Sequence, residues 1–361
     1  MLIVRSPVRI SFGGGGTDLP AYYEKFGGSV LSTSINKYFY TVLQKRNDGK
    51  IQLISSDLRV VETWRDLSRM DIKCSALEIP LAVIKELGRN VSVDLFLASE
   101  IIAGTGLGSS ASVCVGVLRA LTTYLELSLS KYELAERSFF IARNILGKPV
   151  GKQDEYAAAF GGLNFITFTE DGATSVEPVQ LRSDSLRELE SSLMLFFTGV
   201  AHNSWKLLEE QEQATKKHTG STVESLHEIR QLAHYMRNAL VKGDIWAFGD
   251  LMNESWQAKK RISSNISNPL IDEAYDLARL NGARGGKIAG AGGGGFLLLF
   301  CEQSYQEKVR EALAKMQLRE MAFAFDSQGA KVVANDPFID SDERCGMRWT
   351  FTPSYSPAVS F

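Results

Sequence analysis

The residues best suited to chemistry lie in a segment rich in glycine and serine, Gly-Thr-Gly-Leu-Gly-Ser-Ser-Ala-Ser over residues 104–112. It follows a strand-like alternation at 91–98 and precedes a helical apolar pattern that begins near residue 113. Glycines keep such a loop thin, so successive backbone N–H groups can converge on a phosphate beside the positive end of the helix dipole. The loop has neither the lysine of a Walker motif nor GxGxxG spacing. The pattern favours a phosphate cradle, with a structural turn as the alternative.

Asp154 and Arg9 are the candidates for acid–base and charge-stabilising roles. Asp154 is predicted to lie on a loop over 151–156, where it can act as a general base or a metal ligand. A surface acid paired with Lys152 is the alternative. Arg9 lies on a predicted strand, where it can keep Asp154 ionised and neutralise a phosphoryl group during transfer. It can equally pair with a core acid.

A run of four glycines, Gly13 to Gly16, ends that first strand and is followed by Thr17-Asp18. Such a run lets another molecule approach the backbone, or simply forms a flexible turn. Asp18 is typical of an Asx turn, and its carboxylate can also accept hydrogen bonds from sugar hydroxyls. The four histidines show no zinc-ligand spacing.

Composition excludes several classes of protein. The 361 residues suggest two domains. A formal net charge of −2 disfavours a general nucleic-acid binder. The four cysteines are too widely spaced to predict a disulfide framework. Because no apolar run reaches the ~18–20 residues of a membrane span, a soluble cytoplasmic protein without a membrane partner is expected.

Periodicity predicts the elements that must position these residues. Strands are expected over 8–12, within 37–64, over 91–98, 163–168 and 193–198, and on both sides of the glycine loop in 285–300. Ser130-Lys131-Tyr132-Glu133 reads as a capping box that starts a helix, and Ser109, Ser110 or Ser112 is expected to cap the helix before it. Further helices are expected over 222–242, 244–262, 269–281 and 304–317, a polar connection over 170–192 and a last strand over 320–333.

Three ordered motifs resemble those of the GHMP small-molecule kinases. Arg5 to Phe12 with Gly14 to Asp18 is similar to the first motif, Gly106 to Ala111 to the second, and Lys287 to Gly295 to the third. The resemblance implies an α+β fold with a ribosomal S5 domain 2-like N-terminal domain over 1–190 and a ferredoxin-like C-terminal domain over 191–333. The tail over 334–361 has no predicted role.

The resemblance also implies the site and its cofactors, ATP and Mg²⁺. Asp154 and Arg9 would be catalytic, and Ser110 would bind the metal. The predicted ATP-binding residues are Gly104, Thr105, Gly106, Leu107, Gly108, Ser109, Ser110, Ala111 and Ser112. The predicted substrate-binding residues are Gly14, Gly15, Gly16, Thr17, Asp18, Lys152, Gly292 and Gly293.

Residues 151–162 look most like the D-glycero-D-manno-heptose 7-phosphate kinases, with fucokinase-type sugar kinases next. This implies transfer to a sugar's anomeric hydroxyl. Galactokinases have a glutamate at the position of Gly15 that binds the sugar's 6-hydroxyl, so Gly15 leaves room for a seventh carbon and its phosphate. Cations must then lie nearby, and Lys152, Lys287 and His202 are the candidates in that order.

One departure concerns the metal. Many relatives have a Mg²⁺-binding glutamate about 12 residues before the catalytic aspartate, where this chain has Ala142, and Glu136 is a poor substitute. A non-catalytic ATP or sugar sensor is therefore an alternative to the kinase, as is a fucokinase-like sugar 1-kinase. A decarboxylase of the isoprenoid branch ranks last, because residues 152–156 look like those of sugar kinases. The oligomeric state, with a homodimer as one option, is left open.

Overall fold

The computed structural model describes residues 1–65, 72, 75–89, 91–199, 204–217 and 220–336. Its first sheet has eight strands, in the order β12-β1-β2-β5-β3-β4, with β6 and β7 joined through β2. The strands are β1 (Leu2–Gly13), β2 (Gly28–Lys45), β3 (Ile51–Ser55), β4 (Val60–Trp64), β5 (Val93–Ser99), β6 (Leu163–Phe168), β7 (Thr174–Pro178) and β12 (Lys331–Asn335). The long strand β2 pairs with β6 through its first part and with β5 through its second.

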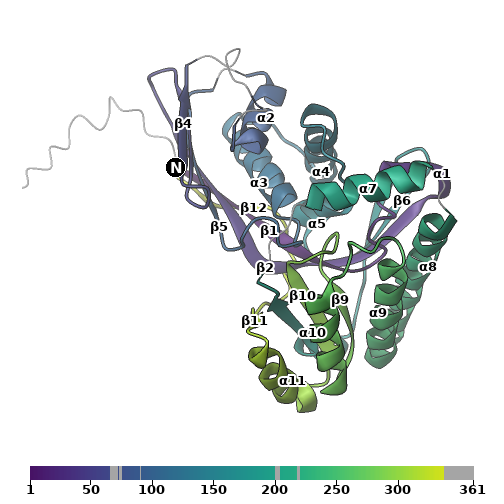
Figure 1. The fold of residues 1–361 in the computed structure, drawn as a ribbon. Helices are drawn as coiled ribbons and strands as arrows, with labels where there is room; N and C mark the ends of the chain where they lie inside the picture. The colour runs from purple at the N-terminus through teal and green to yellow at the C-terminus, as the bar shows by residue number, and fades with distance from the viewer. Residues whose placement is uncertain (66–71, 73–74, 90, 200–203, 218–219, 337–361) are drawn as a thin grey trace, which may run out of the picture.

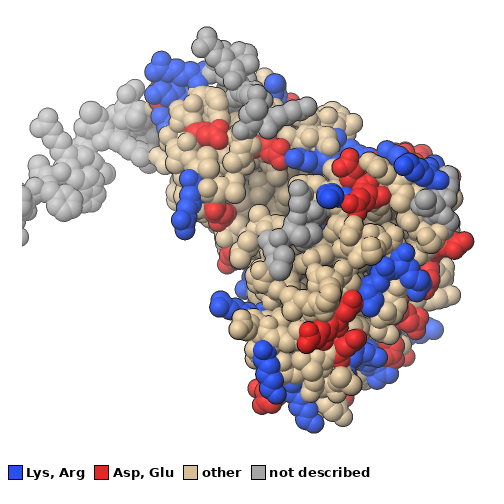
Figure 2. Space-filling view, in the orientation of Figure 1, with Lys and Arg blue, Asp and Glu red and all other residues tan. Residues whose placement is uncertain are grey.

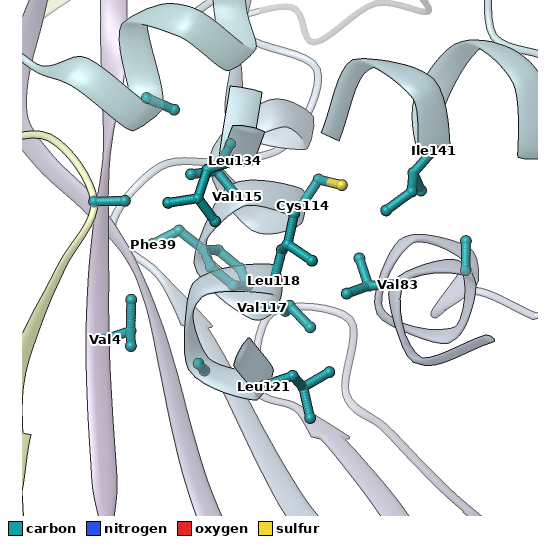
Figure 3. Close-up of a cluster of buried hydrophobic side chains, with 14 of the residues drawn as sticks. Val4, Phe39, Val83, Cys114, Val115, Val117, Leu118, Leu121, Leu134 and Ile141 are labelled. Atoms are coloured by element: carbon teal, nitrogen blue, oxygen red, sulfur yellow. The ribbon is translucent and has the colours of Figure 1, made fainter. Parts of the chain in front are cut away.

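Helices cover one face of this sheet, and α3 lies at their centre (Figure 1). The elements are α1 (Pro20–Phe26), α2 (Glu78–Leu87), α3 (Ser109–Tyr124), α4 (Lys131–Phe140), the π-helix η3 (Ile141–Ile145) and α5 (Gln153–Phe160). Figure 3 shows side chains of α3 between Phe39 of the sheet, Val83 of α2 and Leu134 of α4. Burying each such apolar side chain contributes about 1.5–3 kcal/mol. This packing fixes the N-terminus of α3, which faces the glycine loop.

The second sheet has four antiparallel strands in the order β11-β8-β10-β9. They are β8 (Leu193–Phe197), β9 (Ala283–Ile288), β10 (Phe296–Cys301) and β11 (Arg319–Glu320). The accompanying helices are α6 (Ser183–Ser191), α7 (Ser204–Lys216), α8 (Gly220–Lys242), α9 (Ile245–Lys260), α10 (Pro269–Leu280) and α11 (Gln303–Lys315). A buried core that includes Phe12, Phe248 and Leu298 joins the two sheets, with the first two rings 5.3 Å apart. The two halves therefore share one apolar interface.

Most expected elements are present where periodicity predicted them. The capping box at Ser130 is confirmed, since its side chain and that of Glu133 each bond the other's backbone. Asn268 caps α10 directly before Pro269. The short helices α1, α2 and α7 had no clear signal in the sequence, and the segment over 170–192 holds β7 and α6 rather than only a connection.

Three local predictions were wrong. The expected loop over 151–156 is largely the start of α5. None of the serines caps α3, because Gly108 holds that position with a φ of 77°, a conformation that favours glycine. The expected strand over 320–333 is split, and its second part, β12, pairs with β1. The end of the described chain thus returns to the first sheet.

Among the described residues, no helix is both long enough and apolar enough to cross a bilayer. On the face drawn in Figure 2, acidic and basic side chains are interspersed around the uncharged surface.

Candidate active site

A cavity of about 430 Å³ is lined by segments from both halves of the molecule. Its wall includes the end of β1, the glycine loop before α3, the start of α5, α7, α9 and the glycine loop after β9. Ligand sites typically span about 300–1,000 Å³, so this volume suits small molecules. Segments that are far apart in the sequence therefore meet at one concave site.

Arg9 and Asp154 form a two-pronged ion pair at this cavity. Nε and Nη2 of Arg9 donate to the two carboxylate oxygens of Asp154 at 2.7 and 2.8 Å. Nη1 donates to the carbonyl oxygen of Gly106 at 2.6 Å, and the Arg9 backbone N–H donates to that of Leu107 at 2.9 Å. One buried guanidinium thus joins β1, the glycine loop and α5, and it fixes the Asp154 carboxylate at the cavity wall.

The predicted phosphate loop divides into two sets of residues. Those that line the cavity are Gly104, Gly106, Gly108, Ser109, Ser110 and Ala111. Thr105, Leu107 and Ser112 do not line it and instead hold the loop in place. The Ser112 hydroxyl donates to the carbonyl of Pro7 at 2.7 Å, and the Thr105 hydroxyl donates to that of Ile102 at 2.8 Å. The prediction of direct ATP contact therefore needs correction at these three positions.

The first motif divides in the same way. Gly15, Gly16 and Asp18 line the cavity, whereas Gly14 and Thr17 do not. The Thr17 hydroxyl donates to the carbonyl of Gly14 at 2.8 Å, so these two residues shape the turn. A Cβ on Gly14 would lie 1.9 Å from the Ser29 carbonyl oxygen.

The carboxylate of Asp18 is held by three N–H donors. It accepts from the backbone of Gly16 at 2.9 Å, and from the backbone and side chain of Gln153 at 3.2 and 3.1 Å. Burial and, to a lesser degree, the nearby Asp154 raise the pKa of Asp18. A Cβ on Gly151 would lie 2.0 Å from an Asp18 oxygen, so only glycine permits this approach. The bonds orient Asp18 toward the site.

Lys152 does not line the cavity, contrary to prediction. Its ammonium donates to Glu136 at 2.8 Å and to the carbonyl of Gly172 at 2.8 Å, and it lies near the Phe139 ring. It therefore has a structural role on the far side of α5. Glu136, the partner of Lys152 in this ion pair, does not line the cavity either.

Two other lysines supply positive charge to the cavity. Lys287, the second candidate from the sequence, donates to the carbonyl of Ser11 at 3.0 Å. Lys259 of α9 donates to the carbonyl of Gly290, and no motif in the sequence had marked this lysine. Both are buried, and among the described residues neither forms an ion pair. Burial, with Arg9 contributing, lowers the pKa of Lys259 to about 8; burial and the neighbouring Lys259 lower the pKa of Lys287 well below its usual value.

Glu155 is a further carboxyl group that sequence reasoning did not select. It lines the cavity directly after Asp154 and is 2% exposed. Burial and the adjacent Asp154 raise its pKa well above the ordinary value. Its carboxylate also lies near the Cys114 thiol, whose pKa burial raises to about 12, with Glu155 adding to the shift.

Several buried polar atoms on the cavity wall have no hydrogen-bond partner within the described part of the chain. They are Ser11 Oγ, Gln153 Oε1, Gln211 Nε2 and Glu155 Oε2. Buried polar groups in folded proteins are normally paired, so these atoms are suited to bind a polar ligand. Gln211 lies on α7, which no sequence motif marked.

The third glycine motif is divided among the cavity wall, the second motif and Ile266. A Cβ on Gly290 would lie 2.7 Å from the Cα of Gly106. Gly292 and Gly293, predicted to bind substrate, pack against Ile266, and the Gly293 N–H donates to its carbonyl at 2.8 Å. Gly290 and Ala291 line the cavity in their place. His202, the third candidate cation, lies outside the described residues.

Comparison with known proteins agrees with this geometry. The models for "GHMP kinases N terminal domain" and "GHMP kinases C terminal" match residues 73–162 and 236–317. A D-glycero-alpha-D-manno-heptose 7-phosphate kinase of Campylobacter jejuni is 34% identical over 334 residues, covering 91% of this chain and 97% of that protein. The chain belongs to the GHMP kinase family.

Two further relatives of this GHMP kinase are informative. A crystal structure described as a D-glycero-D-manno-heptose 1-phosphate kinase from Bacteroides thetaiotaomicron has a TM-score of 0.77 and 30% identity, covering 93% of this chain and all of that one. An L-fucokinase/L-fucose-1-P guanylyltransferase of Bacteroides fragilis is 27% identical over 82% of this chain but only 34% of its own length. The predicted two-domain GHMP fold is confirmed. ATP is the phosphoryl donor of the family.

Replacing Asp154 with Asn is expected to lower kcat by about 100-fold or more, because a positioned general base contributes about 10²–10⁴-fold. The amide keeps an acceptor for Arg9, so affinity for ATP should change little. Single-turnover kinetics and calorimetric ATP titration measure the two quantities. Turnover close to that of the unaltered enzyme would remove Asp154 from the mechanism.

Proposed function

We propose that this GHMP kinase transfers the γ-phosphoryl group of ATP to the anomeric hydroxyl of D-glycero-D-manno-heptose 7-phosphate. The product is the 1,7-bisphosphate, an intermediate for nucleotide-activated heptose made in the cytoplasm. One observation carries this proposal. The wall of a single cavity holds both polar atoms that lack a hydrogen-bond partner in the described chain and two buried lysines. Such a wall suits a ligand with many hydroxyl groups and a phosphate.

Residues around Gly15 form the proposed sugar end of the cavity. A Cβ on Gly15 would lie 3.5 Å from Ser11 Oγ and 3.6 Å from Gln153 Nε2. Lys287 bonds the Ser11 backbone, so its charge lies beside the same group. We assign Lys287 and Lys259 to the phosphate on carbon 7, in place of Lys152.

In the proposed reaction, Asp154 accepts the proton of the anomeric hydroxyl while that oxygen attacks the γ-phosphorus. The bond from the γ-phosphorus to the bridging oxygen breaks, and ADP leaves. Arg9 keeps the Asp154 carboxylate oriented, and Asp18 accepts a hydrogen bond from a sugar hydroxyl. The backbone N–H groups of the loop before α3 hold the phosphates of ATP. Phosphoryl transfer depends mainly on positioning and charge stabilisation, so these roles are sufficient.

Mg²⁺ accompanies ATP in this proposal, with Ser110 on the cavity wall as a hydroxyl donor. In the regions that the structure describes, no three His, Cys, Asp or Glu side chains gather as a metal site. A serine hydroxyl together with the phosphates of ATP supplies oxygen donors, which suit Mg²⁺ because it prefers oxygen ligands and keeps several waters. When bound, the ion neutralises charge on the β- and γ-phosphates.

Release of ADP over a panel of acceptors tests the proposal. The panel holds heptose 7-phosphate, unphosphorylated heptose, heptose 1-phosphate, fucose, galactose and mevalonate. We expect kcat/KM for heptose 7-phosphate to exceed that for the unphosphorylated sugar by about 100-fold, since each charge-assisted hydrogen bond contributes about 1.5–3 kcal/mol.

Other results of the panel have distinct meanings. Preference for heptose 1-phosphate, the sugar phosphate named in the description of the Bacteroides thetaiotaomicron structure, would mean that the acceptor is not the hydroxyl on carbon 1. Preference for fucose would favour the fucokinase-like alternative. Equal kcat/KM for the phosphorylated and unphosphorylated heptose would contradict a phosphate subsite.

Replacing Gly15 with Glu is expected to lower kcat/KM for heptose 7-phosphate by about 100-fold, and for the unphosphorylated heptose much less. Like charges brought together cost several kcal/mol, and the new carboxylate would face the phosphate. Gly15→Ala is the control, because its Cβ would make only ordinary contacts at 3.5 and 3.6 Å. A decrease of equal size for both sugars would mean that Gly15 provides space alone.

The pH profile of kcat/KM for heptose 7-phosphate is expected to fall as pH rises through about 8, the pKa of Lys259. Below that pH Lys259 is a cation and attracts phosphate; above it the amine is neutral. The second pKa of a phosphate monoester, about 6, lies below this range, so the substrate stays dianionic. In Lys259→Met the fall should disappear and the value should stay low.

Lys260→Met serves as the control, because Lys260 pairs with Asp272 and lies outside the cavity wall. It should keep the profile of the unaltered enzyme. A fall near pH 8 that persists in Lys259→Met would assign the titration to another group.

A further inference from the structure

The Glu155 carboxyl group is the one cavity-lining acid of the described chain whose oxygen is both buried and unpartnered. Its Oε2 has no hydrogen-bond partner, and the residue is 2% exposed. The neighbouring acids differ: Asp154 binds Arg9, Asp18 accepts three N–H bonds, and Glu78 pairs with Lys148 at 2.9 Å. Burying a carboxylate without a cation or donor is costly, so this position is built for a group the protein chain does not supply.

Two other residues locate that position. Glu155 lies near Cys114, and Ser110 precedes Cys114 by one turn of α3 on the same face. The Cys114 thiol contacts the Ser138 carbonyl at 3.8 Å, and Ala142 follows Ser138 by about one turn. Ser110 on α3 and Ala142 on η3 thus each lie about one turn from the contact between Cys114 and Ser138. All four of Ser110, Cys114, Ala142 and Glu155 line the cavity.

Ala142 leaves this part of the wall without a polar side chain. It lies in the π-helix η3, a distortion that is frequent at functional sites. Its side chain is a methyl group, so the carboxyl group among these four residues comes from Glu155 of α5 and not from η3.

We infer that Glu155 is the carboxylate ligand, directly or through a bound water, of the Mg²⁺ that enters with ATP, with the Ser110 hydroxyl on the other side. Mg²⁺ typically uses one or two carboxylates together with substrate phosphates, which matches this donor set. The inference rests on the proposed ATP-dependent reaction but not on the identity of the sugar. Glu155 would thus bind the metal, whereas its neighbour Asp154 would accept the proton.

Binding of Mn²⁺, a paramagnetic substitute for Mg²⁺, tests this assignment without turnover. The full-length enzyme is titrated with Mn²⁺ in the presence of a non-hydrolysable ATP analogue, and the electron paramagnetic resonance signal counts free Mn²⁺. Glu155→Gln keeps the shape of the side chain and is expected to weaken Mn²⁺ binding by about tenfold or more. Its thermal unfolding temperature should not fall, because the amide has nearly the same size as the carboxyl group and adds no buried charge.

Glu78→Gln is the matched control, since it removes a cavity-lining carboxylate that already has Lys148 as its partner. It should leave Mn²⁺ affinity unchanged. A second variant, Ala142→Glu combined with Glu155→Gln, should regain most of the lost affinity, because it returns a carboxylate to the same space from η3.

Mn²⁺ affinity in Glu155→Gln equal to that of the unaltered protein would overturn the inference and leave Glu155 as a neutral buried acid. A loss in Glu78→Gln instead would assign the metal to that carboxylate. Failure of the double variant to regain affinity would overturn the shared position of residues 142 and 155. Because no sugar is present in the titration, failure of the heptose assignment would not alter these readouts.

Discussion

The ion pair between Arg9 and Asp154 is the interaction on which the geometry of the site depends. Arg9 is 4% exposed, so its charge must be met by protein groups, and it uses Asp154 and the backbone of the glycine loop. Removing one partner of such a pair typically costs about 3–5 kcal/mol, because the other charge stays buried. The loop and α5 are therefore fixed relative to β1 by the same guanidinium. The Asp154 carboxylate and the glycine loop are positioned together, because neither can move without leaving Arg9 unpaired.

The other charged groups of the cavity are only partly stabilised by the protein chain, which leaves them able to interact with a ligand. Lys259 and Lys287 have lowered pKa values and Asp18 has a raised one, each chiefly because of burial. Such shifts mark charges that the chain does not fully compensate. A phosphate beside the lysines would favour their charged forms and so bind more strongly than a neutral hydroxyl. In the reaction we propose, these uncompensated charges would favour an anionic substrate over a neutral one.

Glycine runs and strand alternation in the sequence located the glycine loops and Arg9. The same patterns missed the cavity-lining residues that lie on helices, such as Glu155 and Lys259. Treating residues 151–156 as a loop made Lys152 a natural neighbour of Asp154. Successive helical residues point about 100° apart, so residues 152 and 154 face nearly opposite sides, and Asp154 lines the cavity while Lys152 does not. The sequence pattern did not predict that Lys259 is buried either, because a lysine on an amphipathic helix is usually exposed to solvent. Only tertiary packing buries it against Gly290.

The third glycine motif shows a packing role that the family resemblance did not reveal. Glycines there permit two backbones to approach: a Cβ on Gly106 would lie 2.3 Å from the Ala289 carbonyl oxygen, and one on Gly295 would lie 2.3 Å from that of Thr105. The Phe296 N–H also donates to the Thr105 carbonyl at 3.3 Å. The glycine loop before α3 is thus packed directly on the end of the second sheet, which also presents Lys287. A displacement of that sheet would shift the loop and Lys287 together, so in the reaction we propose the sites for ATP and for the sugar phosphate share one support.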